Sequence, residues 1–127
     1  KYWLGAILLT SFPAWGVLPY APTPAEVAMC EAKGMSAATG YQGHYCDGLR
    51  FLNRAYSAMG NKKEMQYYLN VAIDNFNYEL NRKVVDIDRQ AEFHVGKARA
   101  LKLLGRNAEA AREFDKALRY KIKWPDT

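Results

Sequence analysis

The chain has 127 residues, half of them hydrophobic, and a formal net charge of +5 at pH 7. This composition indicates a globular chain and excludes a disordered one, because enough apolar surface is available to build a core. No nucleic-acid reading motif accompanies the positive charge, and the sequence has no Ser/His/Asp order, phosphate-cradling glycine loop or haem-attachment motif. The sequence therefore predicts a protein that is not an enzyme, with no cofactor and no nucleic-acid partner.

The first segment, residues 1–22, is predicted to be a hydrophobic anchor helix of the signal-anchor kind. No charged residue occurs from Tyr2 to Ala25. A helix from Tyr2 to Tyr20 would span about 27 Å at 1.5 Å per residue, close to the roughly 30 Å of hydrocarbon in a bilayer. Aromatic rings settle at membrane–water interfaces. Four of them stand near the ends of this segment: Tyr2, Trp3, Trp15 and Tyr20.

Two other interpretations of this segment stay open. The triplet Ala14-Trp15-Gly16 is typical of a cleavage site, so the segment could be a secretory signal peptide, leaving a soluble periplasmic chaperone or pilus-type adaptor. It could also be a helix of a soluble core. If the anchor is retained, Lys1 predicts that the N-terminal side faces the cytoplasm. The chain would then be a single-pass protein of the inner (cytoplasmic) membrane, in contact with the lipid bilayer, with its repeat domain in the periplasm.

Residues 23–45 are predicted to form a short helix and a loop. Thr23, Pro24 and Glu26 have the order of a helix cap, a first-turn proline and a capping-box partner. Gly34 is placed to end this helix, because glycine adopts the left-handed conformation that terminates helices.

Cys30 and Cys46 are the only two cysteines of the chain. An even pair in an exported segment predicts a disulfide, which would contribute roughly 3 kcal/mol by restricting the unfolded chain. The alternative is a periplasmic copper-handling site, because sulfur and imidazole ligands suit Cu(I). Its candidate ligands are Cys30, His44 and Cys46, with Met29 and Met35 nearby in the sequence.

A pattern that occurs twice dominates the rest of the chain: an apolar stripe at helical spacing, a glycine, and a second amphipathic helix. Gly60 and Gly105 can adopt the left-handed conformation that ends a helix, and Asn61 and Asn107 are suitable caps for the returning helices. The first copy contains Leu49, Leu52, Tyr56 and Met59, then Met65, Leu69, Ala72 and Ile73; the second contains Ala98, Leu101 and Leu104, then Ala110, Phe114, Ala117 and Leu118.

These positions resemble those of the tetratricopeptide repeat family, with two units that begin at Cys46 and Ala91. The resemblance implies an all-α protein: a transmembrane anchor helix followed by a short α-solenoid of helical hairpins over residues 46–127. The chain departs from the family at Met65, which holds a usually small position, and at Lys97, which replaces an expected leucine. Extra residues must lie around 77–90, because the two glycines are too far apart for one family repeat. An ordinary helical bundle is the alternative.

In this family the first helix of each unit lines a concave groove that holds partner peptides. The resemblance therefore implies that a groove exists here and that its basic side chains would bind an acidic segment or a C-terminal carboxylate. Carried over by position, the candidate residues are Asp47, Arg50, Arg54, Ser57, Glu92, Val95, Arg99 and Lys102.

The excess positive charge lies wholly in residues 82–127, and the last basic residues, Arg119, Lys121 and Lys123, stand beside Trp124. This cluster suits anionic lipid headgroups or an acidic partner. It suits equally a solvated helix end whose basic side chains offset the helix dipole.

Two repeats leave the hydrophobic ends of a solenoid uncovered. Together with the anchor, this predicts a non-catalytic accessory subunit or assembly adaptor whose partners are subunits of an integral membrane protein complex. The alternative function is periplasmic copper handling by the cysteines and His44.

Overall fold

The structure, a computed structural model, describes residues 16–34, 43–82 and 87–122. Within these ranges all regular secondary structure is helical, so the all-α prediction is confirmed. The helices are α1 (Pro24–Ala32), α2 (Gly43–Ser57), α3 (Lys62–Asn81), α4 (Ile87–Leu103) and α5 (Asn107–Ile122).

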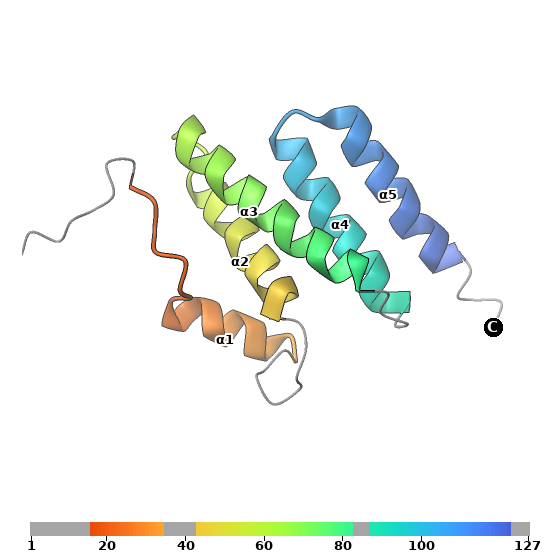
Figure 1. Cartoon of the computed structure of the whole chain (residues 1–127), viewed down its shortest axis with the longest axis horizontal. Helices are drawn as coiled ribbons and strands as arrows, with labels where there is room; N and C mark the ends of the chain where they lie inside the picture. The colour runs from red at the N-terminus through yellow and green to blue at the C-terminus, as the bar shows by residue number, and fades with distance from the viewer. Residues whose placement is uncertain (1–15, 35–42, 83–86, 123–127) are drawn as a thin grey trace, which may run out of the picture.

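Four of the helices form two stacked hairpins. α2 packs along α3, α4 packs along α5, and α3 joins the two hairpins by packing on α4. The four helices therefore lie side by side in a row, with α1 beside the beginning of α2 (Figure 1). α2 also contacts α4, so these two first helices of the hairpins share one face of the row.

The core centres on the ring of Phe76 in α3, which is fully buried. Two glycines from other helices lie against this ring. A Cβ atom on Gly48 of α2 would lie 2.6 Å from the ring, and one on Gly96 of α4 would lie 2.5 Å from it. Only hydrogen at these two positions leaves room for the ring. Phe51, Tyr68, Leu69 and Phe93 are also fully buried and extend the core between the hairpins.

The two hairpin turns differ, although a glycine stands in each. Gly105 has a φ of 80°, and the amides of Gly105 and Arg106 donate to the carbonyls of Lys102 and Leu101 at 3.0 and 2.9 Å. This is the Schellman ending that the sequence predicts. Gly60 has no left-handed φ; its turn is closed by the amide of Asn61, which donates to the carbonyl of Ala58 at 2.8 Å.

The caps of the returning helices also differ from each other. The Asn61 side chain accepts from the amide of Glu64 at 3.1 Å, so the predicted cap of α3 is confirmed. Asn107, by contrast, is the first residue of α5. The capping position is held by Arg106, whose carbonyl accepts from the Ala110 amide at 3.0 Å.

The buried face of α2 is not the predicted apolar stripe. Leu52 is buried, but Tyr56 and Met59 are 46% and 61% exposed. Ala55 and Ala58 take their place in the core, because small side chains allow α2 and α3 to approach closely. Further along the chain, α3 continues to Asn81, so part of the extra length expected around 77–90 extends this helix.

The predicted anchor helix over residues 1–22 is contradicted. In the ranges 16–34, 43–82 and 87–122, no helix combines the length and the apolar character needed to cross a membrane. Residues 16–22 belong to that predicted helix and are not helical. Pro19 and Pro22 explain this, since the residue before a proline is pushed toward an extended conformation. Tyr2, Trp3 and Trp15 lie outside the described residues.

We expect Gly48→Ala to lower the free energy of unfolding by about 1–3 kcal/mol, because the Phe76 ring has Gly96 on its other side and cannot move away. Urea denaturation followed by circular dichroism measures this loss. Gly60→Ala is the control, since its added Cβ meets nothing within 4 Å. If the two variants were equally stable, the close packing at Phe76 would not limit stability.

Candidate functional site

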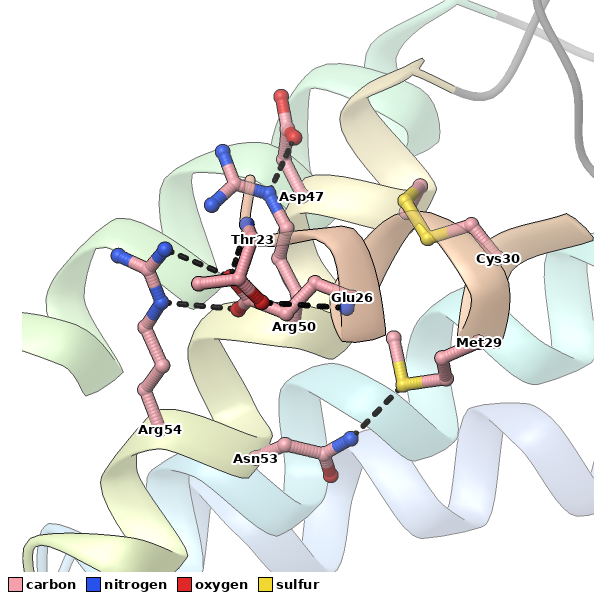
Figure 2. Close-up of a disulfide and its surroundings, with 9 residues drawn as sticks. Thr23, Glu26, Met29, Cys30, Asp47, Arg50, Asn53 and Arg54 are labelled. Atoms are coloured by element: carbon pink, nitrogen blue, oxygen red, sulfur yellow. Dashed lines mark hydrogen bonds and ion pairs between the residues drawn. A yellow bond between two sulfur atoms is a disulfide. The ribbon is translucent and has the colours of Figure 1, made fainter. Parts of the chain in front are cut away.

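The extended segment before α1 is bound to α2 by the side chain of Arg54, which is 6% exposed. Its Nη1 donates to the Pro19 carbonyl at 2.8 Å and its Nη2 to the Ala21 carbonyl at 3.1 Å. The same guanidinium donates from Nε and Nη2 to the two carboxylate oxygens of Glu26, at 2.8 and 2.7 Å (Figure 2). Arg54 thus supplies the hydrogen bonds that a helix would otherwise have given to these carbonyls.

Glu26 takes part in two interactions at once. The Thr23 amide donates to Oε1 of Glu26 at 2.9 Å, and the Glu26 amide donates to Oγ1 of Thr23 at 3.2 Å. This is the capping box that the sequence predicts. Burial alone would raise the pKa of Glu26, but the hydrogen bonds from Arg54 and Thr23 outweigh it and hold the pKa below its ordinary value. The carboxylate therefore stays ionised and keeps α1 attached to Arg54.

Two tyrosines complete the contact between the N-terminal segment and the hairpin. The Leu18 amide donates to the hydroxyl of Tyr68 at 2.8 Å, and burial raises the pKa of Tyr68. The ring of Tyr20 lies 5.0 Å from that of Phe51. Its hydroxyl accepts from Nδ2 of Asn75 at 3.3 Å. Tyr20, predicted at a membrane interface, is thus part of the folded domain.

Arg50 lies one helical turn before Arg54 and is 1% exposed. Its Nε donates to Oδ1 of Asp47 at 2.8 Å, and its guanidinium stacks on the rings of Tyr20 and Phe51, at 5.1 and 4.6 Å from their centroids. Its Nη1 is buried without a hydrogen-bond partner among the described residues. Arg50 is therefore enclosed by its own chain.

The first half of the predicted groove is consequently occupied by the protein itself. Asp47 and Arg50 pair with each other, and Arg54 pairs with Glu26 of α1. Of the four predicted residues here, only Ser57 is exposed. A small hollow of about 290 Å³ remains between the segment and α2, lined in part by Thr23, Glu26, Arg50, Arg54 and Ser57. Two of the basic side chains expected to bind a partner have an internal role.

The structure joins Cys30 and Cys46 in a disulfide, with Cα atoms 5.7 Å apart, so α1 is linked covalently to α2 (Figure 2). Beside it, Nδ2 of Asn53 donates to Sδ of Met29 at 2.9 Å. Both predicted partners of the disulfide are thus brought together, and neither sulfur is left as a thiolate.

His44 does not converge with the cysteines. It lies within α2, because this helix begins at Gly43, three residues before Cys46, the predicted start of the first repeat. Its Nδ1 is 2.8 Å from Oδ1 of Asn75, and its ring stacks on Tyr78 at 3.7 Å. No group of His, Cys, Asp or Glu among the described residues could hold a metal ion, so the geometry gives the copper hypothesis no support. Met35 lies outside the described residues.

The second half of the predicted groove is open. A groove of about 590 Å³ runs between α2 and α4, and Lys33, just after α1, is one of its lining residues. Predicted residues Glu92, Val95 and Arg99 line it; Lys102, also predicted, is exposed but is not among its lining residues. The other lining residues are Tyr45, Leu49, Asp88, Arg89, Ala91 and Gly96.

The charges along this groove are unevenly balanced. Nη1 of Arg89 lies 2.9 Å from Oε2 of Glu92. Burial raises the pKa of Tyr45, and the negative charge of Glu92 and a hydrogen bond to its carboxylate raise it further. Glu92 is therefore engaged by both Arg89 and Tyr45. Lys33 and Arg99 are exposed, and no carboxylate within residues 16–34, 43–82 and 87–122 forms an ion pair with either. The described lining thus carries three cations, Lys33, Arg89 and Arg99, against two carboxylates, Asp88 and Glu92, beside an apolar floor.

A buried polar cluster joins α4 to α5. Nδ1 of His94 lies 2.6 Å from Oε2 of Glu113, and Nζ of Lys97 and Nζ of Lys116 lie 3.3 and 3.2 Å from its Oε1. Burial alone would raise the pKa of Glu113, but the hydrogen bond with His94 and the charge of Lys97 hold it below the ordinary value. The sequence gives no indication that His94 has this carboxylate partner.

Sequence reasoning missed Lys33, Tyr45 and Arg89 as lining residues of the groove. A signal for Lys33 existed, because the predicted disulfide between Cys30 and Cys46 already brings the end of α1 to the beginning of α2. Tyr45 was missed because the predicted first repeat begins at Cys46, whereas α2 begins at Gly43. Arg89 was missed because it lies in the first turn of α4, two residues before Ala91, the predicted start of the second repeat.

Arg54→Met should lower the free energy of unfolding by about 2–4 kcal/mol, because it leaves a mostly buried carboxylate and two carbonyls without their donor. Hydrogen exchange should also show loss of protection at the Leu18 amide. Arg119→Met is the matched control: it removes an exposed pair with Asp115 and should cost less than about 0.5 kcal/mol. Equal losses in the two variants would contradict the role assigned to Arg54.

We expect the stability of the protein to fall in acid. Folding lowers the pKa of both Glu26 and Glu113 below the ordinary carboxyl value of 4.5, so their contribution is complete above the unfolded-state pKa and is lost as the pH drops from there through the lower folded-state pKa. Urea denaturation across this range should show a smaller pH dependence for Glu26→Gln than for the wild type. Glu31→Gln changes an exposed residue of the same helix and should leave the pH dependence of stability unaltered. If stability depended on pH in the same way in Glu26→Gln and in the wild type, Glu26 would be excluded as a source of that dependence.

Compared with known proteins, the chain matches no protein-family model, no curated protein and no solved structure.

Proposed function

We propose that this protein is a non-catalytic adaptor that holds an acidic segment of a partner protein in the groove between α2 and α4. The observation that carries the proposal is the pairing of an apolar floor with two cations that have no ion-pair partner among the described residues. Leu49, Ala91 and Val95 supply the floor, and Lys33 and Arg99 supply the charge.

The position of the groove supports the same function. It lies between the first helices of the two hairpins, which is where the resemblance to tetratricopeptide repeats implies that a partner peptide binds. Its size, about 590 Å³, is in the range of ligand-binding clefts. A short acidic segment can place apolar side chains on the floor and carboxylates beside Lys33 and Arg99, where charge-assisted hydrogen bonds would hold it.

The wider setting that we propose is a larger assembly in an oxidising compartment. The disulfide between Cys30 and Cys46 supports an exported location, because such bonds persist where thiols are oxidised. Exposed Tyr56, Met59 and Tyr78 on the hairpins add apolar surface outside the groove, which suits an accessory subunit in contact with other chains. The protein would act by holding its partner, with no reaction of its own.

The test is the affinity of the full chain for a fluorescein-labelled peptide of alternating glutamate and leucine, measured by fluorescence anisotropy. We expect saturable binding, and we expect no binding of the same peptide with lysine in place of glutamate. Arg99→Gln and Lys33→Gln should each weaken binding about fivefold, the effect of losing one charge-assisted hydrogen bond.

Lys62→Gln is the matched control, because Lys62 is an exposed lysine at the start of α3 and does not line the groove. It should bind the acidic peptide like the wild type. Equal binding of the acidic and basic peptides, or an equal loss in Lys62→Gln, would show that the groove does not select its partner and would overturn the proposal.

A further inference from the structure

A second hollow lies on the other side of α4, where α4 packs on α5. It measures about 430 Å³, and its lining among the described residues is His94, Lys116, Arg119 and Tyr120. None of these residues belongs to the groove between α2 and α4. The two sites are therefore separate, and what binds here is independent of the adaptor function proposed above.

The imidazole of His94 is held in one orientation. Its Nδ1 lies 2.6 Å from Oε2 of Glu113, and its ring stacks on the ring of Tyr120 with 5.7 Å between centroids and an angle of 21°. Because Nδ1 faces the carboxylate of Glu113, the other ring nitrogen, Nε2, points away from that carboxylate. The hydrogen bond of this ring within the described part of the chain is made by Nδ1, and the residue, which is 9% exposed, lines the hollow.

The charges around the hollow favour an anion. Glu113 is the carboxylate nearest to His94, and both of its oxygens are already used, one by His94 and one by Lys97 and Lys116 together. Asp115 is paired with Arg119 at 2.7 Å. The cationic side chains Lys97, Lys116 and Arg119 outnumber these two carboxylates even when His94 is neutral. Those lining residues that the structure describes include no acid.

We propose that this hollow binds inorganic phosphate or a similar phosphate-type oxyanion. Lys116 and Arg119 can donate to its charged oxygens, and the Tyr120 hydroxyl can donate to a third. Nε2 of His94 suits phosphate in either protonation state: the imidazolium donates to a phosphate oxygen, and the neutral ring accepts from a phosphate hydroxyl. A fully ionised carboxylate has no hydroxyl to offer the neutral ring, which is why phosphate fits this set of groups better.

The experiment follows the two imidazoles of the full chain by nuclear magnetic resonance while sodium phosphate is added at fixed neutral pH. The chain has two histidines, and His44 serves as an internal reference, because it lies in α2 and is bonded to Asn75. We expect a saturable shift of the His94 signals and none of the His44 signals. Sodium chloride at the same ionic strength should produce no saturable shift.

Lys116→Gln should weaken phosphate binding about fivefold, since it removes one charged donor. This side chain is 53% exposed, so the variant should fold. Lys102→Gln is the matched control, because Lys102 is an exposed lysine on α4 that does not line the hollow. Three results would each overturn the proposal: a shift that sodium chloride reproduces, equal shifts of both histidines, or an equal loss of affinity in the two variants.

Discussion

The guanidinium group of Arg54 joins the extended N-terminal segment, the start of α1 and the body of α2. Its N–H donors have fixed directions in one plane, and here they meet two carbonyls and one carboxylate. The carbonyls of Pro19 and Ala21 have no helix to satisfy them, and the carboxylate of Glu26 is mostly buried, so each would be costly without this donor. Phe51, whose ring centroid is 4.7 Å from the guanidinium, adds a cation–π contact. Together with the disulfide between Cys30 and Cys46, this side chain fixes the position of α1, and with it the covered part of the surface.

This arrangement divides the surface formed by α2 and α4 into two parts. The half nearer to the N-terminus is covered, because Arg50 and Arg54 bind the chain's own residues. The other half is open between Tyr45 and Arg99. Gly48 of α2 and Gly96 of α4 both pack against the ring of Phe76, which limits how closely these two helices can approach it. Among the lining residues of this open half, Lys33 and Arg99 are exposed and have no ion-pair partner in the part of the chain that the structure describes.

Local features of the fold were predictable because their causes are local. The capping box at Thr23 and Glu26, the ending at Gly105 and the cap at Asn61 each involve residues within a few positions of one another. The disulfide was predictable from cysteine count. The anchor was not a sound prediction, because an apolar run with prolines can equally pack along a domain as an extended segment. Hydropathy records how apolar the run is, and it carries no information about which donor will satisfy its carbonyls.

The candidate site likewise has features that the sequence predicts and features that it does not. By itself the sequence determined an all-helical fold, the starts of α1 and α3, the end of α4, and which residues stand on the first helix of each hairpin. Only the tertiary structure decided which of those residues are available. Arg54 and Arg99 have the same chemistry and corresponding places in the two hairpins, yet one is buried against Glu26 and the other faces an open groove. The difference arises from contacts between residues far apart in the chain, 28 positions in the case of Glu26 and Arg54, and the burial and pairing of a charge depend on what folding brings beside it.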